Sequence, residues 1–284
     1  QEIHIFHTRD GGQTWEDARL PDPQGLSAFG VGRLDLDFVN SQTGWALVEV
    51  QSSAIFSTGE LFRTLDGGKT WSQLSAPAGG EIHFIDLRRG WLAGGPGGGQ
   101  LFETRDGGLT WQPSAPGLSA NGDDSLPYYH LPVFSDDLEG LLPLARGHPA
   151  APRLEIYATH DGGLSWSLAL TLPLDPQNNL SGPLPLSPAG HERYQASLPD
   201  GSLLVISSLG DHLASQIISP RGLPSGVQKI AGSGSASAWA LAQNSLCRGD
   251  KRSADFYCDQ RAQLFATHDG GLSWKEISLP PAFE

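Results

Sequence analysis

Several acidic side chains stand close together in the sequence and supply the groups that acid–base catalysis needs. The candidates are Asp35, Asp37, Asp86, Asp123, Asp124, Asp136, Asp137 and Glu139. A glycoside hydrolase needs two such carboxyl groups about 5–9.5 Å apart, one of them protonated near neutral pH. Spacing along the chain does not show that any two of them face each other, and the competing interpretation is that they are solvated turn residues. Glycoside hydrolysis is therefore the alternative function and not the favoured one.

Other reaction types find little support in the motifs. The sequence has no Gly-x-Ser-x-Gly nucleophile motif and no phosphate-binding loop ending in Gly-Lys-Ser/Thr. The glycine run at 94–99 lies between two expected strands, which favours a hairpin loop over a phosphate cradle. Two cysteines without histidines at ligand spacing do not complete a tetrahedral metal site. We expect no catalytic residue, no metal and no cofactor.

Two segments are candidate binding sites. Tyr128, Tyr129 and His130 combine aromatic area with polar tips, a combination suited to a protein or glycan contact, and ordinary packing at a sheet edge is the competing interpretation. Arg248, Lys251 and Arg252 form a basic loop in an acidic chain. That loop is either an anion contact or a solvated loop held by a disulfide.

The two cysteines flank this basic loop. Ten mostly polar residues separate Cys247 from Cys258. An even number of cysteines closing a short loop predicts a local disulfide and an oxidising compartment, and the alternative is two reduced thiols.

The elements that must position these residues follow from an internal repeat. Five segments share the pattern Thr-x-Asp-Gly-Gly-x-Thr/Ser-Trp, and in each an aliphatic and an aromatic residue stand just before the pattern: Thr8–Trp15, Thr64–Trp71, Thr104–Trp111, Thr159–Trp166 and Thr267–Trp274. Asp-Gly-Gly is typical of a hairpin turn, because glycine tolerates positive φ and aspartate accepts hydrogen bonds from turn N–H groups. We therefore assign a folding role to Asp10, Asp66, Asp106, Asp161, Asp269, Trp15, Trp71, Trp111, Trp166 and Trp274.

A weaker repeat of strand, polar turn and Gly-Trp or Gly-Leu precedes three of these hairpins, at 36–47, 82–93 and 131–142. Two hairpins per unit make four strands, and a period of about 40–55 residues in an all-β chain predicts a β-propeller. We expect one domain over 1–284 with about six blades, five or seven being the alternatives. The hairpins are expected at 3–19, 60–75, 100–114, 155–170 and 263–279, and a degenerate blade at about 190–220.

The repeated pattern resembles the Asp-box, or BNR repeat, of sialidases and sortilin-type receptors. Together with Gly-Trp about twenty residues upstream, it is most similar to the photosystem II stability and assembly factor group. The resemblance implies a peripheral turn that identifies the fold and leaves function open. A sialidase is disfavoured, because the Phe/Tyr-Arg-Ile-Pro motif of that family is missing. The most similar segment, at 62–65, belongs to an expected hairpin.

Composition excludes further classes. The 284 residues carry 18 basic and 31 acidic side chains, a net charge of −13, which argues against a nucleic-acid partner. No apolar run reaches the ~18–20 residues of a membrane span. The sequence has no Met, even at position 1, so we expect that an N-terminal segment such as a leader has been removed.

These observations favour a non-enzymatic binding or scaffold protein outside the cytoplasm. It is expected to be a monomer that recognises a protein or an extended ligand through loops on one face, because long propeller loops are where function is carried. An assembly-factor-like role is what the resemblance implies.

The disulfide is directly testable. If Cys247 and Cys258 are bonded, the unreduced protein will resist thiol alkylation even after denaturation, and mass spectrometry will show alkylation only after reduction. Alkylation without a reductant would refute the bond.

Overall fold

A computed structural model describes residues 3–7, 14–21, 31–51, 57–114, 116, 127–146, 152–175, 180, 184, 186–189, 193–209, 212–233, 236–248 and 257–277. For 31, 32, 51, 57, 209, 233, 244–248 and 257–260 only the backbone is described. The chain divides into two compact units, Gln1–Pro132 with Leu142–Arg146, and Val133–Leu141 with Gly147–Glu284. The expectation of one domain over 1–284 stays a prediction.

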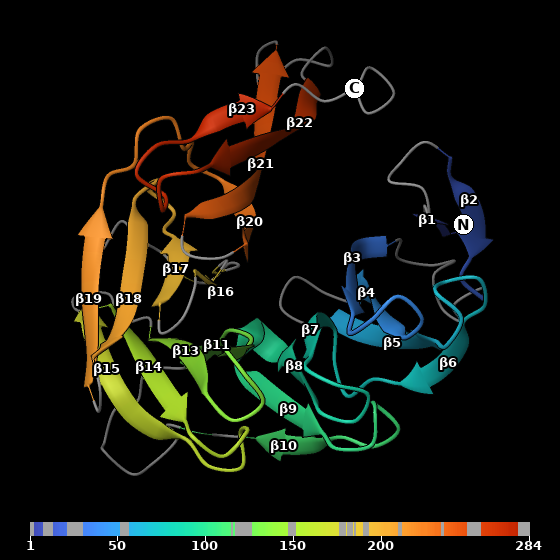
Figure 1. Ribbon diagram of the computed structural model, residues 1–284. Helices are drawn as coiled ribbons and strands as arrows, with labels where there is room; N and C mark the ends of the chain where they lie inside the picture. The colour runs from blue at the N-terminus through green and yellow to red at the C-terminus, as the bar shows by residue number, and fades with distance from the viewer. Residues whose placement is uncertain are drawn as a thin grey trace. The chain divides into compact units, whose positions relative to one another are not determined.

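The first unit contains three sheets of antiparallel strands, which follow one another along the chain (Figure 1). The two-stranded sheet is β1 (His4–His7) and β2 (Glu16–Arg19). The next is β3 (Val31–Phe38), β4 (Gly44–Gln51), β5 (Ser57–Thr64) and β6 (Ser72–Ser75). The third is β7 (Gly80–Phe84), β8 (Gly90–Gly94), β9 (Gln100–Thr104) and β10 (Gln112–Ser114), with the 3-10 turn η1 (Pro96–Gly98) before β9.

The boundary between the units passes through strand β13 (Gly140–Arg146). In the first unit β13 pairs with β11 (Pro127–Tyr129). In the second it pairs with β12 (Val133–Phe134), and β14 (Arg153–Thr159) pairs with β15 (Ser167–Pro173).

Two four-stranded antiparallel sheets complete the second unit. One is β16 (Leu186–Pro188), β17 (Arg193–Ser197), β18 (Leu203–Leu209) and β19 (His212–Ile218), where the sequence predicted a degenerate blade. The other is β20 (Val227–Ser233), β21 (Ser237–Arg248), β22 (Tyr257–Thr267) and β23 (Lys275–Ile277). The fold class is confirmed as all-β, with the four-stranded antiparallel blades of a propeller. The described residues form five blades, four of them with four strands and one, β11–β15, with the short extra strand β12, together with one two-stranded sheet, and this is compatible with the expected number.

Hydrogen bonds within the Asp-Gly-Gly turns explain why the repeated residues are needed. Thr64 Oγ1 accepts from the N–H of Gly68 and donates to Asp66 Oδ1, both at 2.9 Å. The other carboxylate oxygen of Asp66 accepts from the Thr70 hydroxyl at 2.6 Å, and Trp71 Nε1 donates to Gly68 O at 3.0 Å. The same carboxylate bonds recur at Asp106, Asp161 and Asp269. Asp10 lies outside the described residues, and Trp15 is 48% exposed.

Each described Asp-Gly-Gly turn also binds the first turn of its own sheet. Gly67 has a φ of 74°, which favours glycine, and its N–H donates to Gln42 O at 2.8 Å. Equivalent bonds run from Gly107 to Arg88, from Gly162 to Leu138 and from Gly270 to Ala236. The two turns at this end of a sheet therefore stabilise each other.

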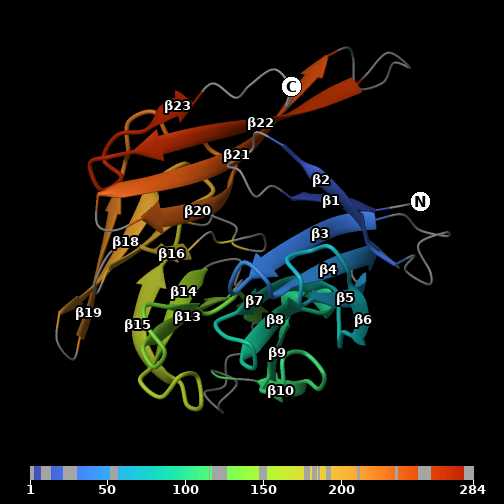
Figure 2. The ribbon, with the colours of Figure 1, turned by 45° about the vertical axis from the view of Figure 1, so that its right-hand side comes forward.

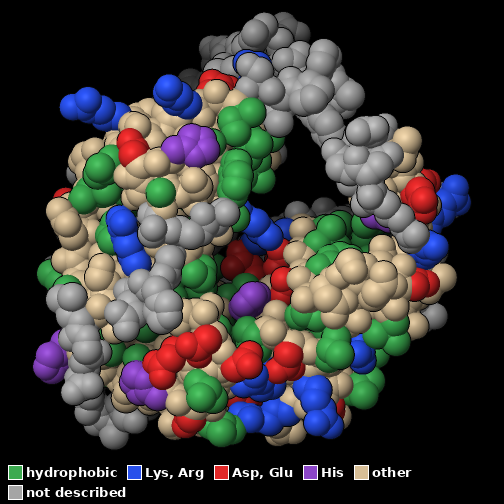
Figure 3. Space-filling model, in the orientation of Figure 1, with side chains coloured by type: hydrophobic (Ala, Val, Ile, Leu, Met, Phe, Trp, Pro, Cys, Tyr) green, Lys and Arg blue, Asp and Glu red, His purple; other side chains and the backbone are tan. Residues whose placement is uncertain are grey.

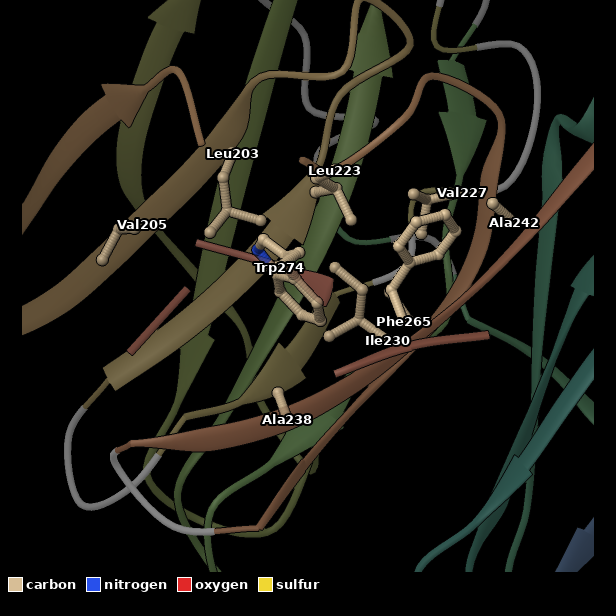
Figure 4. Packing of buried hydrophobic residues seen from close by; sticks show 10 residues of the cluster. Leu203, Val205, Leu223, Val227, Ile230, Ala238, Ala242, Phe265 and Trp274 are labelled. Carbon is tan, nitrogen blue, oxygen red and sulfur yellow. The ribbon is translucent and has the colours of Figure 1, made fainter. Parts of the chain in front are cut away.

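Apolar clusters pack one sheet on the next within each unit. Ile5 and Leu20, from the β1–β2 hairpin, pack on Val48 and Phe62 of the neighbouring sheet. Figure 2 shows β1 and β2 beside that sheet. In the second unit, Leu203 of β18 lies against the last sheet and its turn tryptophan, Trp274 (Figure 4). The described residues include no helix long and apolar enough to cross a bilayer.

The carboxylates of the Asp-Gly-Gly turns predict an acid-sensitive fold. The pKa values of Asp66, Asp161 and Asp269 are lowered from 3.8 to about 2, first by the hydroxyl and then by the N–H of the Thr or Ser four residues later. A carboxyl whose pKa falls on folding stabilises the fold fully above its unfolded pKa and loses this effect as pH drops through the folded one. We expect the urea midpoint to fall between about pH 4 and about pH 2.

Asp161→Asn supplies the control, because it cannot titrate. Its urea midpoint should start lower at neutral pH and change less on acidification. An unchanged pH dependence in this variant would contradict the assignment.

Candidate functional site

Two aspartates of the inner strand β3 bind the backbone of the next sheet. β7 is the edge strand of its sheet, so its outward N–H groups need acceptors. Asp35 Oδ2 accepts from the N–H of Ile82 at 3.0 Å, and Asp37 Oδ2 accepts from the N–H of Phe84. Asp35 is only 4% exposed. Alternate residues of one strand thereby cover alternate N–H groups of the other.

Charged groups extend this contact to both sides. Arg33, two residues before Asp35, forms a 2.6 Å ion pair with Glu81 at the start of β7. At the other side, His83 Nδ1 lies 3.2 Å from the carboxylate of Asp37. The face of β3 that carries these residues therefore joins the two sheets.

The other candidate carboxylates that the structure describes also have structural partners. Asp86 and Asp136 accept two backbone N–H bonds each in the turns that follow β7 and β12. Burial raises the pKa of Asp86, but hydrogen bonds from the N–H and guanidinium of Arg89 outweigh it and leave the pKa lowered, the opposite of what a general acid needs. Glu139 lies 2.6 Å from His160. In the space-filling view, acidic and basic side chains lie side by side over β7–β10 (Figure 3).

Asp137 is exposed and has a partner of its own, whereas Asp123 and Asp124 lie outside the described residues. Asp35, Asp37, Asp86 and Asp136 thus all accept hydrogen bonds from main-chain N–H groups.

Tyr128 and His130 share one face of the segment at β11, whereas Tyr129 does not. Tyr129 is 2% exposed, and its hydroxyl donates to Pro116 O at 2.9 Å, which makes it a packing residue. The rings of Tyr128 and His130 lie 5.1 Å apart. A Cβ on Gly98 of η1 would lie 2.2 Å from the Tyr128 ring, and Gly98 has a φ of 71°, so glycine is required beneath this ring.

Charged groups act on Tyr128, whereas His130 is buried. Burial raises the pKa of the Tyr128 phenol, and the charges of Glu81 and Glu49 add to this while Arg33 opposes it. Burial lowers the pKa of His130 to about 3, so the imidazole is neutral at physiological pH. Its Nε2 is buried and has no hydrogen-bond partner among the described residues, a cost of about 1–3 kcal/mol.

We name the group Arg33, Glu49, Glu81, Tyr128 and His130 the Tyr128 cluster. All five belong to the first unit, and Glu49 stands directly across the ladder from Arg33. Because neighbouring strands are antiparallel, the cluster lies at the end of the sheets opposite the Asp-Gly-Gly turns. The sequence predicted binding at Tyr128 and His130, and that role stays a prediction. It did not predict the three charged residues, although the alternation Arg33-x-Asp35-x-Asp37 was a visible signal.

The predicted basic loop lies largely outside the described residues. Arg248 ends strand β21, but its side chain is not described, and neither are Lys251 and Arg252. Cys247 and Cys258 stand opposite each other in the β21–β22 ladder. Their disulfide stays a prediction. Among the described residues, no group of three or more His, Cys, Asp or Glu is arranged to hold a metal ion.

Comparison with known proteins leaves the function open. No family model and no curated protein matches the chain. Similar solved structures include YCF48 bound to D1 peptide, with 17% identity, TM-score 0.46, and coverage of 88% of this chain and 83% of that one. Another is the GH74 xyloglucanase from Xanthomonas campestris, with 12% identity, TM-score 0.45, and coverage of 88% of this chain and 38% of that one. A third is the soluble aldose sugar dehydrogenase from Escherichia coli, with 14% identity, TM-score 0.43, and coverage of 84% of this chain and 87% of that one. The names of these structures cover enzymes and a peptide complex, and they assign no activity to this chain.

The role of Asp35 is testable by unfolding. Asp35→Ala leaves the buried N–H of Ile82 without its acceptor, and we expect a loss of about 1–3 kcal/mol in the free energy of unfolding by urea. Asp35→Asn keeps a carbonyl acceptor and should lose less. Equal losses in the two variants would show that the hydrogen bond is not the cause.

Proposed function

We propose that this chain is a non-enzymatic binding protein that recognises an extended segment of a protein partner at the Tyr128 cluster. One observation carries the proposal. Tyr128 is partly exposed, and its ring lies over Gly98 and 5.1 Å from the ring of His130, whose buried Nε2 has no hydrogen-bond partner among the described residues. The charges of the Arg33–Glu81 ion pair act on Tyr128. A rigid aromatic residue beside charged groups is typical of a binding hot spot.

The engagement of the candidate carboxylates supports binding over glycoside hydrolysis. Asp35 and Asp37 accept hydrogen bonds from the main chain, and the pKa of Asp86 is lowered. A retaining or inverting glycosidase needs one carboxyl group with a raised pKa. A location outside the cytoplasm belongs to the same proposal, and it depends on the predicted disulfide.

Labelled full-length chain can be applied to an array of short unstructured peptides and to an array of glycans. We expect binding to peptides, and Tyr128→Ala should weaken it about tenfold or more, because aromatic anchors carry much of the energy of an interface. Leu109→Ala is the matched control, since Leu109 is 59% exposed at the opposite end of the same unit. It should leave binding unchanged.

Three outcomes would contradict this function: glycan binding without peptide binding, equal effects of the two substitutions, or turnover of a chromogenic glycoside that a single carboxylate substitution abolishes. The first outcome points to a glycan-binding protein, the second removes the Tyr128 cluster as the binding site, and the third points to the glycosidase.

A further inference from the structure

We infer that the Tyr128 cluster binds a cationic side chain of the partner, a lysine or an arginine, over the Tyr128 ring and beside Glu49. This rests on the proposed function and specifies the chemistry of the segment that is recognised.

The charges of the cluster leave a carboxylate for a second cation. Three carboxylates, those of Glu81, Asp35 and Glu49, act on the single guanidinium of Arg33. Glu81 contacts this guanidinium at 2.6 Å, and Asp35 is bound to the N–H of Ile82. Glu49 has no ion pair within 4.0 Å among the described residues and is partly exposed. Local charge therefore favours a cation, and an anion would have to compete with Glu81 for Arg33.

The aromatic ring provides the second half of such a site. A cation over the face of a tyrosine is attracted by the ring quadrupole. The same unit already contains this interaction, because the guanidinium carbon of Arg63 lies 5.4 Å from the centroid of Trp45. Tyr128 is only partly buried.

His130 is the independent observation that points to a ligand. This side chain is 3% exposed, shares the face of Tyr128, and holds a buried Nε2 without a partner. Being neutral, it adds no repulsion toward a cation. In the Nδ1-protonated tautomer of His130, Nε2 is an acceptor that a donor group of a ligand would satisfy. The net charge of −13 also steers cationic partners toward the protein.

Four probe peptides test the inference: acetyl-Gly-Gly-Xaa-Gly-Gly-amide with lysine, arginine, norleucine or glutamate at the central position. Binding to the full chain is followed by chemical-shift changes in NMR spectra of the protein. We expect the lysine and arginine peptides to bind about fivefold or more tightly than the norleucine peptide, which has no charge. The preference should weaken as salt is added.

Glu49→Gln keeps the shape and removes the charge, so it should abolish the preference for lysine and arginine. Glu103→Gln is the matched control. Glu103 lies on β9 of the same unit and already forms an ion pair with Arg105, so its charge is not left for a ligand. Unchanged urea midpoints and spectra establish that both variants fold.

The inference is overturned if norleucine or glutamate binds as well as lysine, if no probe binds, or if Glu49→Gln and Glu103→Gln behave alike. If the peptide array still shows binding that depends on Tyr128, the proposed function survives and only the cationic chemistry is wrong. If the peptide array shows no binding that depends on Tyr128 and the probes show no preference for lysine or arginine, the proposed function and the cationic chemistry are both wrong.

Discussion

The inner edge of each blade imposes the constraint on which the first unit depends. A four-stranded sheet that ends in an inner strand leaves a row of backbone N–H groups without partners, and burying such groups unpaired is costly. Asp35 and Asp37 meet this need for β7, because their carboxylates accept from the N–H groups of Ile82 and Phe84. The spacing of two residues on β3 matches the spacing of two on β7. Hydrogen bonding and strand register are therefore specified together.

A second contact joins the same two sheets beside the hydrogen bond between Asp37 and Phe84. Trp45 is fully buried, stacks on Phe84 with ring centroids 3.7 Å apart, and donates from Nε1 to Gly107 O at 2.9 Å. Gly107 belongs to an Asp-Gly-Gly turn, so the most strongly repeated motif of the chain also accepts a bond from the weaker Gly-Trp repeat. Turn geometry, aromatic stacking and interlocking of sheets are consequently coupled.

The residues that hold the sheets together differ from the residues that we propose for binding. Asp35, Asp37, Asp86 and Asp136, which first suggested catalysis, instead accept hydrogen bonds from the main chain of strands or turns. The opposite end of the sheets carries the Tyr128 cluster, where charge and aromatic surface remain partly exposed. Loops placed on a rigid scaffold commonly carry binding. The carboxylate contacts along β3 supply that rigidity here, immediately beside Arg33 and Glu81.

The sequence by itself determined the all-β class, the Asp-Gly-Gly hairpins and the repeat of four strands, because these depend on turn chemistry and on residues close along the chain. Local patterns also placed a degenerate blade near β16–β19. Only the tertiary structure decided which polar residues meet. Asp35 reaches Ile82, 47 positions away, and the ring of Tyr128 lies 5.1 Å from that of His130 while its neighbour Tyr129 is buried. Likewise Trp45 near the start of β4 is buried, while Trp239 near the start of β21 is 41% exposed. The physical reason is that side-chain roles depend on the register and face of the adjoining sheet, and no local pattern encodes them.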